Sequence, residues 1–329
     1  MWALPTQTSE SMSLRVVPTI SLGVEKDLSD KSSVSIGLLL GVALLAEIPV
    51  LIRISLHPSA ILNAGNLIRK KSLALTILLA YCTAPEEKDT IVECLETKPP
   101  PFGGTIFIDP DIITPDDPSA FVDLSFAGTG TRTMYDRRDG GAWRTLVPYL
   151  FGARFDDNLE IEIQVNPEFG SKEVAENIAQ KFAPVIGRLT TQLRRDVETV
   201  WIHRGMEPFG GGNNNLLIHT DWSERHYERQ GILEETFVHE AAHTSLDARH
   251  AQSPKWLQAQ EADCHFISTY AEDYPLREDI AESYLPYLAV RYRSDRISVA
   301  LKRQIEMTIP NRIEYFDAQD FSMYPILDK

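Results

Sequence analysis

Hydrophobic positions beyond residue 104 alternate between short β-type runs and helical patterns. Short runs rich in apolar and β-branched residues, bounded by turn-forming residues, predict strands rather than helices. These runs are IFI at 106–108, AFVDLSF at 120–126, IEIQV at 161–165, TVWIH at 199–203 and NLLIH at 215–219. The first half of this region is therefore expected to form a sheet.

Helical periodicity lies between and after these strands. Across residues 171–195 apolar side chains recur every three or four positions, Ser171 is suited to cap the helix, and Pro184 is expected to kink it. Further helices are predicted at about 231–246, at 254–271 and from about Leu276 onward. The order of strands, a long helix, two strands and a helical C-terminal half predicts an α+β fold.

The first 85 residues have a different, strongly apolar pattern. Residues 36–46 are an uninterrupted apolar run, but a bilayer span needs about 20 residues. Three basic residues at 69–71 then precede SLALTILLAYCTA, which has the arrangement of a secretory signal peptide. Either residues 1–65 are an over-extended gene model before a real signal, or both runs form a membrane-associated anchor. Both accounts predict an exported protein, secreted, periplasmic or membrane-anchored.

A Pro-rich stretch at 86–103 is interpreted as a linker, which leaves 104–329 as the globular domain. The formal net charge of −15 argues against nucleic acid or an anionic membrane surface as a partner, because phosphates require basic patches. Membrane contact is expected only through the N-terminal segment. None of the three cysteines lies in a CxxC pair, so a cysteine zinc site is not indicated, although Cys82 and Cys94 could pair in an exported protein. The oligomeric state is not indicated.

Half of a metal site stands in the predicted helix 231–246, in the run VHEAAHTSLD. His239 and His243 are four residues apart and therefore lie on one helix face, from which both imidazoles can reach one ion. Glu240 sits about 100° around the helix from His239, beside the ion, where it can take a proton from bound water. A catalytic zinc site needs one more protein ligand.

Two carboxylates four residues apart in EDIAE, Glu278 and Glu282, are the favoured source of that ligand. One can bind the metal while the other accepts the free N–H of a ligating histidine. Other candidates rank lower. His250 falls one position late for the HExxHxxGxxH pattern, and the run has no glycine. Asp247 is expected to brace the helix end, and neither Glu261 nor Asp263 has an acid four residues on.

HExxH followed by a helix with ExxAE resembles the gluzincin branch of zinc metallopeptidases, such as thermolysin-like and anthrax-lethal-factor-like enzymes. The resemblance covers about residues 160–290. It implies Glu278 as third ligand and Glu282 as the acid that supports a histidine. It also implies Tyr270, with Tyr274 as the fallback, as the tyrosine that faces the substrate carbonyl.

The same resemblance implies a zincin-like fold, with a small mixed sheet, a backing helix and an active-site helix. The expected activity is Zn²⁺-dependent hydrolysis of a peptide or protein substrate, with Glu240 as general base. Two alternatives stay open: a zinc-containing binding or structural protein without turnover, and a metallohydrolase of a non-peptide amide.

A glycine-rich loop precedes the strand at 215–219. In zincin-like folds an edge strand at this place binds extended substrate by strand addition. Gly210, Gly211 and Gly212 would allow close approach of another backbone, and a flexible hairpin turn is the alternative. His203 and His219, which end adjacent predicted strands, are expected to be structural.

Overall fold

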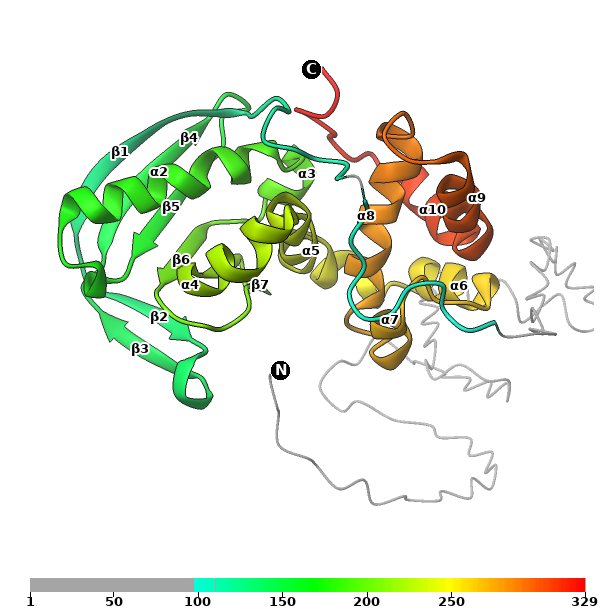
Figure 1. The fold of residues 1–329 in the computed structure, drawn as a ribbon, viewed down its shortest axis with the longest axis horizontal. Helices are drawn as coiled ribbons and strands as arrows, with labels where there is room; N and C mark the ends of the chain where they lie inside the picture. Colours follow the sequence, from blue (N-terminus) through cyan, green and yellow to red (C-terminus); the bar gives the residue numbers. More distant parts are fainter. Residues whose placement is uncertain (1–97, 110, 329) are drawn as a thin grey trace, which may run out of the picture. The chain divides into compact units, whose positions relative to one another are not determined.

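A six-stranded mixed sheet forms one half of the fold in the computed structural model, which describes residues 98–109 and 111–328 (Figure 1). In spatial order its strands are β1 (Phe121–Thr129), β4 (Tyr149–Phe155), β5 (Glu160–Val165), β6 (Thr199–His203), β8 (Asn215–His219) and β7 (Gly210–Gly212). The pairs β5/β6 and β6/β8 are parallel and the other neighbours are antiparallel. The short strand β7 is therefore an edge strand.

Four of the five predicted strands are confirmed, as β1, β5, β6 and β8. The prediction missed β4, whose apolar run is interrupted by Gly152, and β7, which consists of glycine alone. It also missed a separate hairpin of β2 (Arg132–Asp136) and β3 (Ala142–Leu146). Glycine lowers the local strand signal in β4 and β7, and the hairpin strands RTMYD and AWRTL mix polar and apolar residues. In each case pairing with a neighbouring strand defines the segment.

The predicted strand at 106–108 is wrong, because this segment is part of an extended strap. The strap, residues 102–109 and 111–113, starts beside helix α7 (Thr269–Asp273), where Phe102 pairs with Ser268 and the Gly104 N–H donates to Thr269 Oγ1 over 2.8 Å. Ile106 and Ile108 are buried, so the apolar pattern resembles that of a strand.

Side-chain carboxylates bind the backbone N–H groups of the strap, as a neighbouring strand would in a sheet. The Ile106 N–H donates to Glu282 Oε2 over 3.0 Å. The N–H groups of Ile108 and Ile112 donate to the two oxygens of Glu235 over 2.9 and 3.0 Å. Buried backbone donors need partners, and here two buried acids supply them.

Nine helices of α type lie in the described residues. They are α2 (Lys172–Arg188), α3 (Thr191–Arg194), α4 (Thr220–Trp222), α5 (Leu233–Leu246), α6 (Pro254–Asp263), α7 (Thr269–Asp273), α8 (Asp279–Tyr292), α9 (Val299–Thr308) and α10 (Pro310–Asp317). Helix α2 packs on the sheet, and α5 lies between the sheet and the helices that follow it (Figure 1). The mixed sheet and the helical C-terminal half confirm the predicted α+β class.

Three helix boundaries differ from the prediction. The helix expected at 171–195 ends at Arg188, and the one expected at 254–271 is divided at Cys264, whose φ of 57° leaves the helical region. Helix α8 begins at Asp279 rather than near Leu276, which lies in a turn and is 56% exposed. Local turn geometry, which periodicity does not detect, decides these ends.

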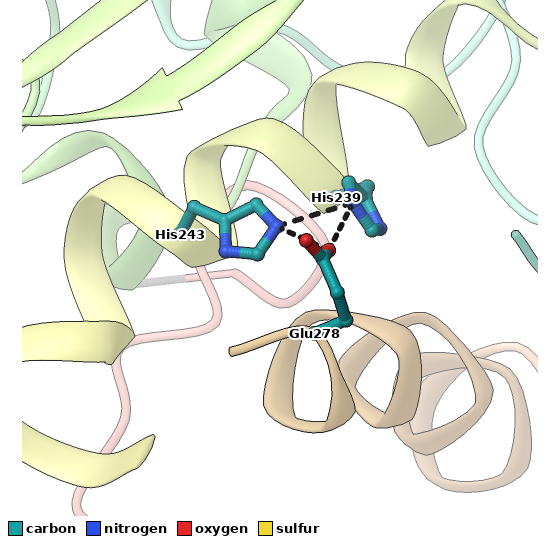
Figure 2. A group of neighbouring side chains, drawn as sticks. All are labelled: His239, His243 and Glu278. Carbon is teal, nitrogen blue, oxygen red and sulfur yellow. Dashed lines mark hydrogen bonds and ion pairs between the residues drawn. The ribbon is translucent and has the colours of Figure 1, made fainter. Parts of the chain in front are cut away.

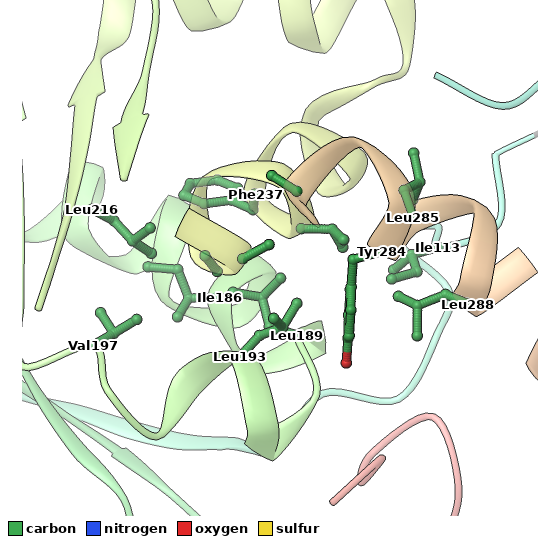
Figure 3. Close-up of a cluster of buried hydrophobic side chains, with 14 of the residues drawn as sticks. Ile113, Ile186, Leu189, Leu193, Val197, Leu216, Phe237, Tyr284, Leu285 and Leu288 are labelled. Atoms are coloured by element: carbon green, nitrogen blue, oxygen red, sulfur yellow. The ribbon is translucent and has the colours of Figure 1, made fainter. Parts of the chain in front are cut away.

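One hydrophobic core joins the sheet to the C-terminal helices (Figure 3). It contains Leu216 from β8, Ile186 from α2, Phe237 from α5 and Leu285 from α8. Full burial of a side chain such as Phe237 contributes about 1.5–3 kcal/mol. Helix α5 is thus held on both sides, by the sheet and by α8.

The predicted signal or anchor, with Cys82 and Cys94, lies outside the described residues. Within the part of the chain that the structure describes, no helix combines the length and apolar character needed to cross a bilayer.

Stability should depend on pH through Glu235. Burial raises the pKa of this carboxyl from 4.5 to about 7, although hydrogen bonds from Ile108 and Ile112 oppose the change. Folding therefore favours the protonated form. The stabilisation is complete below pH 4.5 and is lost as pH rises through 7, a loss of up to about 3 kcal/mol. Chemical denaturation at pH 5 and pH 8 measures it.

In Glu235→Gln this pH dependence should disappear, and at pH 5 the lost acceptor should cost about 1–3 kcal/mol. Glu314→Gln, at an exposed position on α10, is the matched control and should behave as wild type. An unchanged pH dependence in Glu235→Gln would contradict the assignment.

Candidate metal centre

Helix α5 presents His239 and His243 side by side, one turn apart on the same face (Figure 2). Both side chains are 11% exposed, and their Nε2 atoms lie 3.2 Å apart. Glu278, the residue immediately before α8, reaches across to them. Its Oε2 is 3.0 Å from His243 Nε2 and 3.5 Å from His239 Nε2. The packing of α5 against α8 thus brings three possible ligands together.

The spacing of these three atoms fits a metal ion. Tetrahedral zinc with ligands at about 2.0–2.1 Å places its donor atoms about 3.3 Å apart. The observed separations of 3.0, 3.2 and 3.5 Å bracket that value. Two imidazole nitrogens and one carboxylate oxygen are also ligands that zinc accepts.

The opposite ring nitrogen of each histidine faces a carboxylate. Asp247 Oδ2 lies 3.0 Å from His243 Nδ1, and Glu282 Oε1 lies 3.3 Å from His239 Nδ1. A carboxylate beside Nδ1 favours the tautomer with the proton on that atom, which leaves Nε2 as an acceptor. Lone pairs of both Nε2 atoms and of Glu278 Oε2 then converge on one point. Three acceptors in this arrangement repel one another unless a cation lies between them.

The pKa values of His243 and Glu278 are both shifted in the direction that favours their charged forms. Burial opposes a charge on His243, but its hydrogen bonds with Asp247 and Glu278 raise its pKa to about 10. Burial would raise the pKa of Glu278, but the hydrogen bonds and charges of the two histidines hold that pKa well below its usual range. The surroundings therefore stabilise positive charge at the His243 imidazole, and a bound metal cation would supply such a charge.

Glu282 lies beside His239. The side chain is fully buried, and its Oε2 accepts hydrogen bonds from the Ser268 hydroxyl over 2.6 Å and from the Ile106 N–H over 3.0 Å. These two donors orient the carboxylate so that Oε1 faces His239. The strap is thus connected through Glu282 to the candidate metal centre.

Asp247 was missed as a partner of His243, because the sequence indicated a role at the helix end. The four-residue spacing from His243 to Asp247 was the available signal.

Tyr270 lies at the candidate site, where its hydroxyl binds Glu278, one of the three possible metal ligands. Its hydroxyl donates to Glu278 Oε1 over 3.1 Å, and the same oxygen accepts from Arg277 Nε over 2.7 Å. Burial, followed by the charge of Glu278, raises the pKa of Tyr270 to about 12, so the phenol is a neutral donor. The fallback residue Tyr274 packs edge-on against Tyr270, with ring centroids 5.3 Å apart.

The competing ligands lie elsewhere. His250 Nδ1 contacts the Tyr315 hydroxyl at 2.7 Å, and Asp263 pairs with Arg312. His203 and His219 are fully buried in the sheet. Burial lowers the pKa of His203 to about 4, so this residue is neutral and structural.

Glu240 is half-buried, and the edge strand β7 packs closely against its backbone. A Cβ atom at Gly211 would stand 1.8 Å from the Glu240 carbonyl oxygen, so only glycine fits there. The Thr244 hydroxyl also joins β7 to α5. It accepts a hydrogen bond from the Gly212 N–H over 2.9 Å and lies 3.1 Å from the Glu240 carbonyl oxygen. Sequence alone indicated a close backbone approach at the three glycines but did not identify its partner.

Replacement of Gly211 by alanine should push β7 away from α5. An overpacked contact of this kind costs about 1–3 kcal/mol or more, because backbone on both sides has to move. Chemical denaturation measures the loss. Gly210→Ala is the matched control: its Cβ would meet the flexible end of Arg137, which can move. Equal effects of the two substitutions would show that the α5 contact does not restrict the strand.

No known protein family, no curated protein and no solved structure matches this chain.

Proposed function

We propose that this chain is a zinc-dependent peptidase with a zincin-like fold. The observation that carries the proposal is the convergence of three possible ligand atoms, from His239, His243 and Glu278. Glu240, the proposed general base, directly follows His239 on α5. Two imidazoles and one carboxylate are the ligand set of several catalytic zinc sites, in which water takes the fourth position. The fold supports the proposal because a mixed sheet, a backing helix and a ligand-bearing helix occur in the expected order.

Zinc held by His239, His243 and Glu278 would lower the pKa of a coordinated water towards about 7 and polarise a carbonyl group. The chain supplies the proton transfers and the geometry. Asp247 and Glu282 contact the Nδ1 atoms of His243 and His239, which would leave both Nε2 atoms free to bind the ion. Glu240 takes the proton from the attacking water and passes it to the leaving amine.

Tyr270 contacts Glu278, and Tyr227 lies within electrostatic range of Glu240. Tyr270 can donate to the substrate carbonyl oxygen if its hydroxyl leaves Glu278 Oε1, and a donor of this kind is worth about 2.7–4 kcal/mol. Burial, followed by the charge of Glu240, raises the pKa of Tyr227 to about 12, so its phenol stays protonated near the general base.

The edge strand β7 is the proposed docking position for extended substrate. It lies at the end of the sheet, against the backbone of Glu240, so a peptide added as a further strand would run past the metal centre. Export of the protein is a separate proposal, which rests on the signal-like segment at 69–84.

Metal binding should depend on Glu278 and, to a smaller extent, on Asp247. Asp247→Ala should weaken zinc binding about 10–100-fold, as expected when a histidine loses its orienting partner. Glu278→Ala should weaken it further, because a ligand is removed. Competition with a chromophoric chelator measures both affinities, with the exposed Asp320→Ala as control. Full zinc affinity in Glu278→Ala would place the third ligand elsewhere.

Turnover should depend on Glu240 without any change in metal content. A general base contributes about 10²–10⁴-fold, so Glu240→Gln should lower chelator-sensitive cleavage of a mixed peptide library by that factor. Glu272→Gln, at an exposed position on α7, is the control and should cleave as wild type. Zinc-loaded wild-type protein without any cleavage would favour the non-catalytic alternative.

A further inference from the structure

The loop between α7 and α8, residues 274–278, is held rigidly beside the metal centre. The N–H groups of Arg277 and Glu278 both donate to the Tyr274 carbonyl oxygen, over 3.0 and 2.8 Å. Gln260 Nε2 donates to the Pro275 carbonyl oxygen over 2.9 Å. The loop therefore needs little ordering when a ligand binds, which favours recognition.

Arg277 presents a partly free cation from this loop. Its Nε donates to Glu278 Oε1 over 2.7 Å, and its guanidinium lies 4.7 Å from the centre of the Tyr274 ring. A guanidinium has five N–H donors. One carboxylate oxygen and the nearby Tyr270 hydroxyl cannot occupy all of them, and 45% of the side chain is exposed. Donors thus remain for a ligand.

The position of this cation matters because Glu278 connects it to the metal centre. One oxygen of that carboxylate faces the histidines and the other holds Arg277. The guanidinium is therefore close enough to the candidate metal position to bind a group that neighbours the scissile carbonyl. Leu276 and Tyr274, 56% and 37% exposed, add apolar surface on the same loop.

We propose that Arg277 binds a carboxylate of the substrate close to the scissile bond, with apolar neighbours packed on Leu276 and Tyr274. The carboxylate belongs either to an acidic side chain or to a free C-terminus. The proposal rests on the peptidase function and gives it a substrate class. Arginine binds carboxylates through two parallel hydrogen bonds, and a chain with a net charge of −15 repels acidic peptides elsewhere.

The test measures binding to zinc-loaded Glu240→Gln protein, in which cleavage does not remove the ligand. Synthetic peptide libraries are used in four forms: with Asp and Glu or with Asn and Gln, each with a free or an amidated C-terminus. Mass spectrometry quantifies the peptides retained on immobilised protein. Libraries that carry the recognised carboxylate should be retained about tenfold more than the matched libraries in which that carboxylate is replaced by an amide. This ratio corresponds to ~1.4 kcal/mol. Preference for the acidic libraries identifies a side chain, and preference for free C-termini identifies the terminus.

Arg277→Met in the same background should abolish this preference. Arg303→Met, the same substitution at an exposed position on α9, should keep it. Zinc content is measured for each variant. Arg277→Lys, which keeps the charge but not the planar fork, replaces the methionine variant if that variant loses zinc, and it should reduce the preference. Equal retention of all four libraries overturns the proposal. A preference for carboxylates that is unchanged when Arg277 is replaced also overturns it.

The two proposals fail in different ways. If wild-type protein cleaves peptides without any preference for carboxylates, the peptidase function stands and the role of Arg277 is wrong. If carboxylate-selective binding depends on Arg277 but no peptide is cleaved, the recognition stands and the peptidase function is wrong.

Discussion

The packing of α5 against α8 is the contact on which the site depends. It brings Glu278 to His243, although 35 residues separate them in the chain. Neither helix carries a complete site, because α5 offers two nitrogens and the start of α8 one carboxylate oxygen. The core that includes Phe237 and Leu285 keeps the helices at this separation. Any change that shifts one helix against the other changes all three ligand distances.

Buried acids couple the fold to this site. Glu235 and Glu282 are fully buried, a costly arrangement unless donors satisfy the carboxyl oxygens. The extended strap supplies backbone N–H groups to both, and Glu282 also faces His239. The strap therefore packs on the domain and, through Glu282, also orients His239. Without the strap, the carboxylates of Glu235 and Glu282 would lose their backbone N–H donors, and those N–H groups would lose their acceptors. The strap and the helices are therefore expected to assemble together.

Residues one helical turn apart can be assigned to a common face from the sequence, whereas contacts that depend on the geometry of a turn cannot. The pairs His239/His243 and Glu278/Glu282 are four residues apart, so their common face follows from helix geometry. The bond between Arg277 and Glu278 was not anticipated, although the residues are adjacent, because it depends on the turn that precedes α8.

By itself, the sequence determined the α+β order of elements, four of the five predicted strands, and the faces on which candidate ligands lie. These properties depend on local periodicity, which neighbouring residues carry. Tertiary structure alone decided that residues 106–108 form a strap, that Gly211 lies on the Glu240 backbone, and that the ligand atoms are about 3 Å apart. Each of these depends on segments that meet only after the chain has folded, when burial of the core outweighs the conformational entropy that is lost.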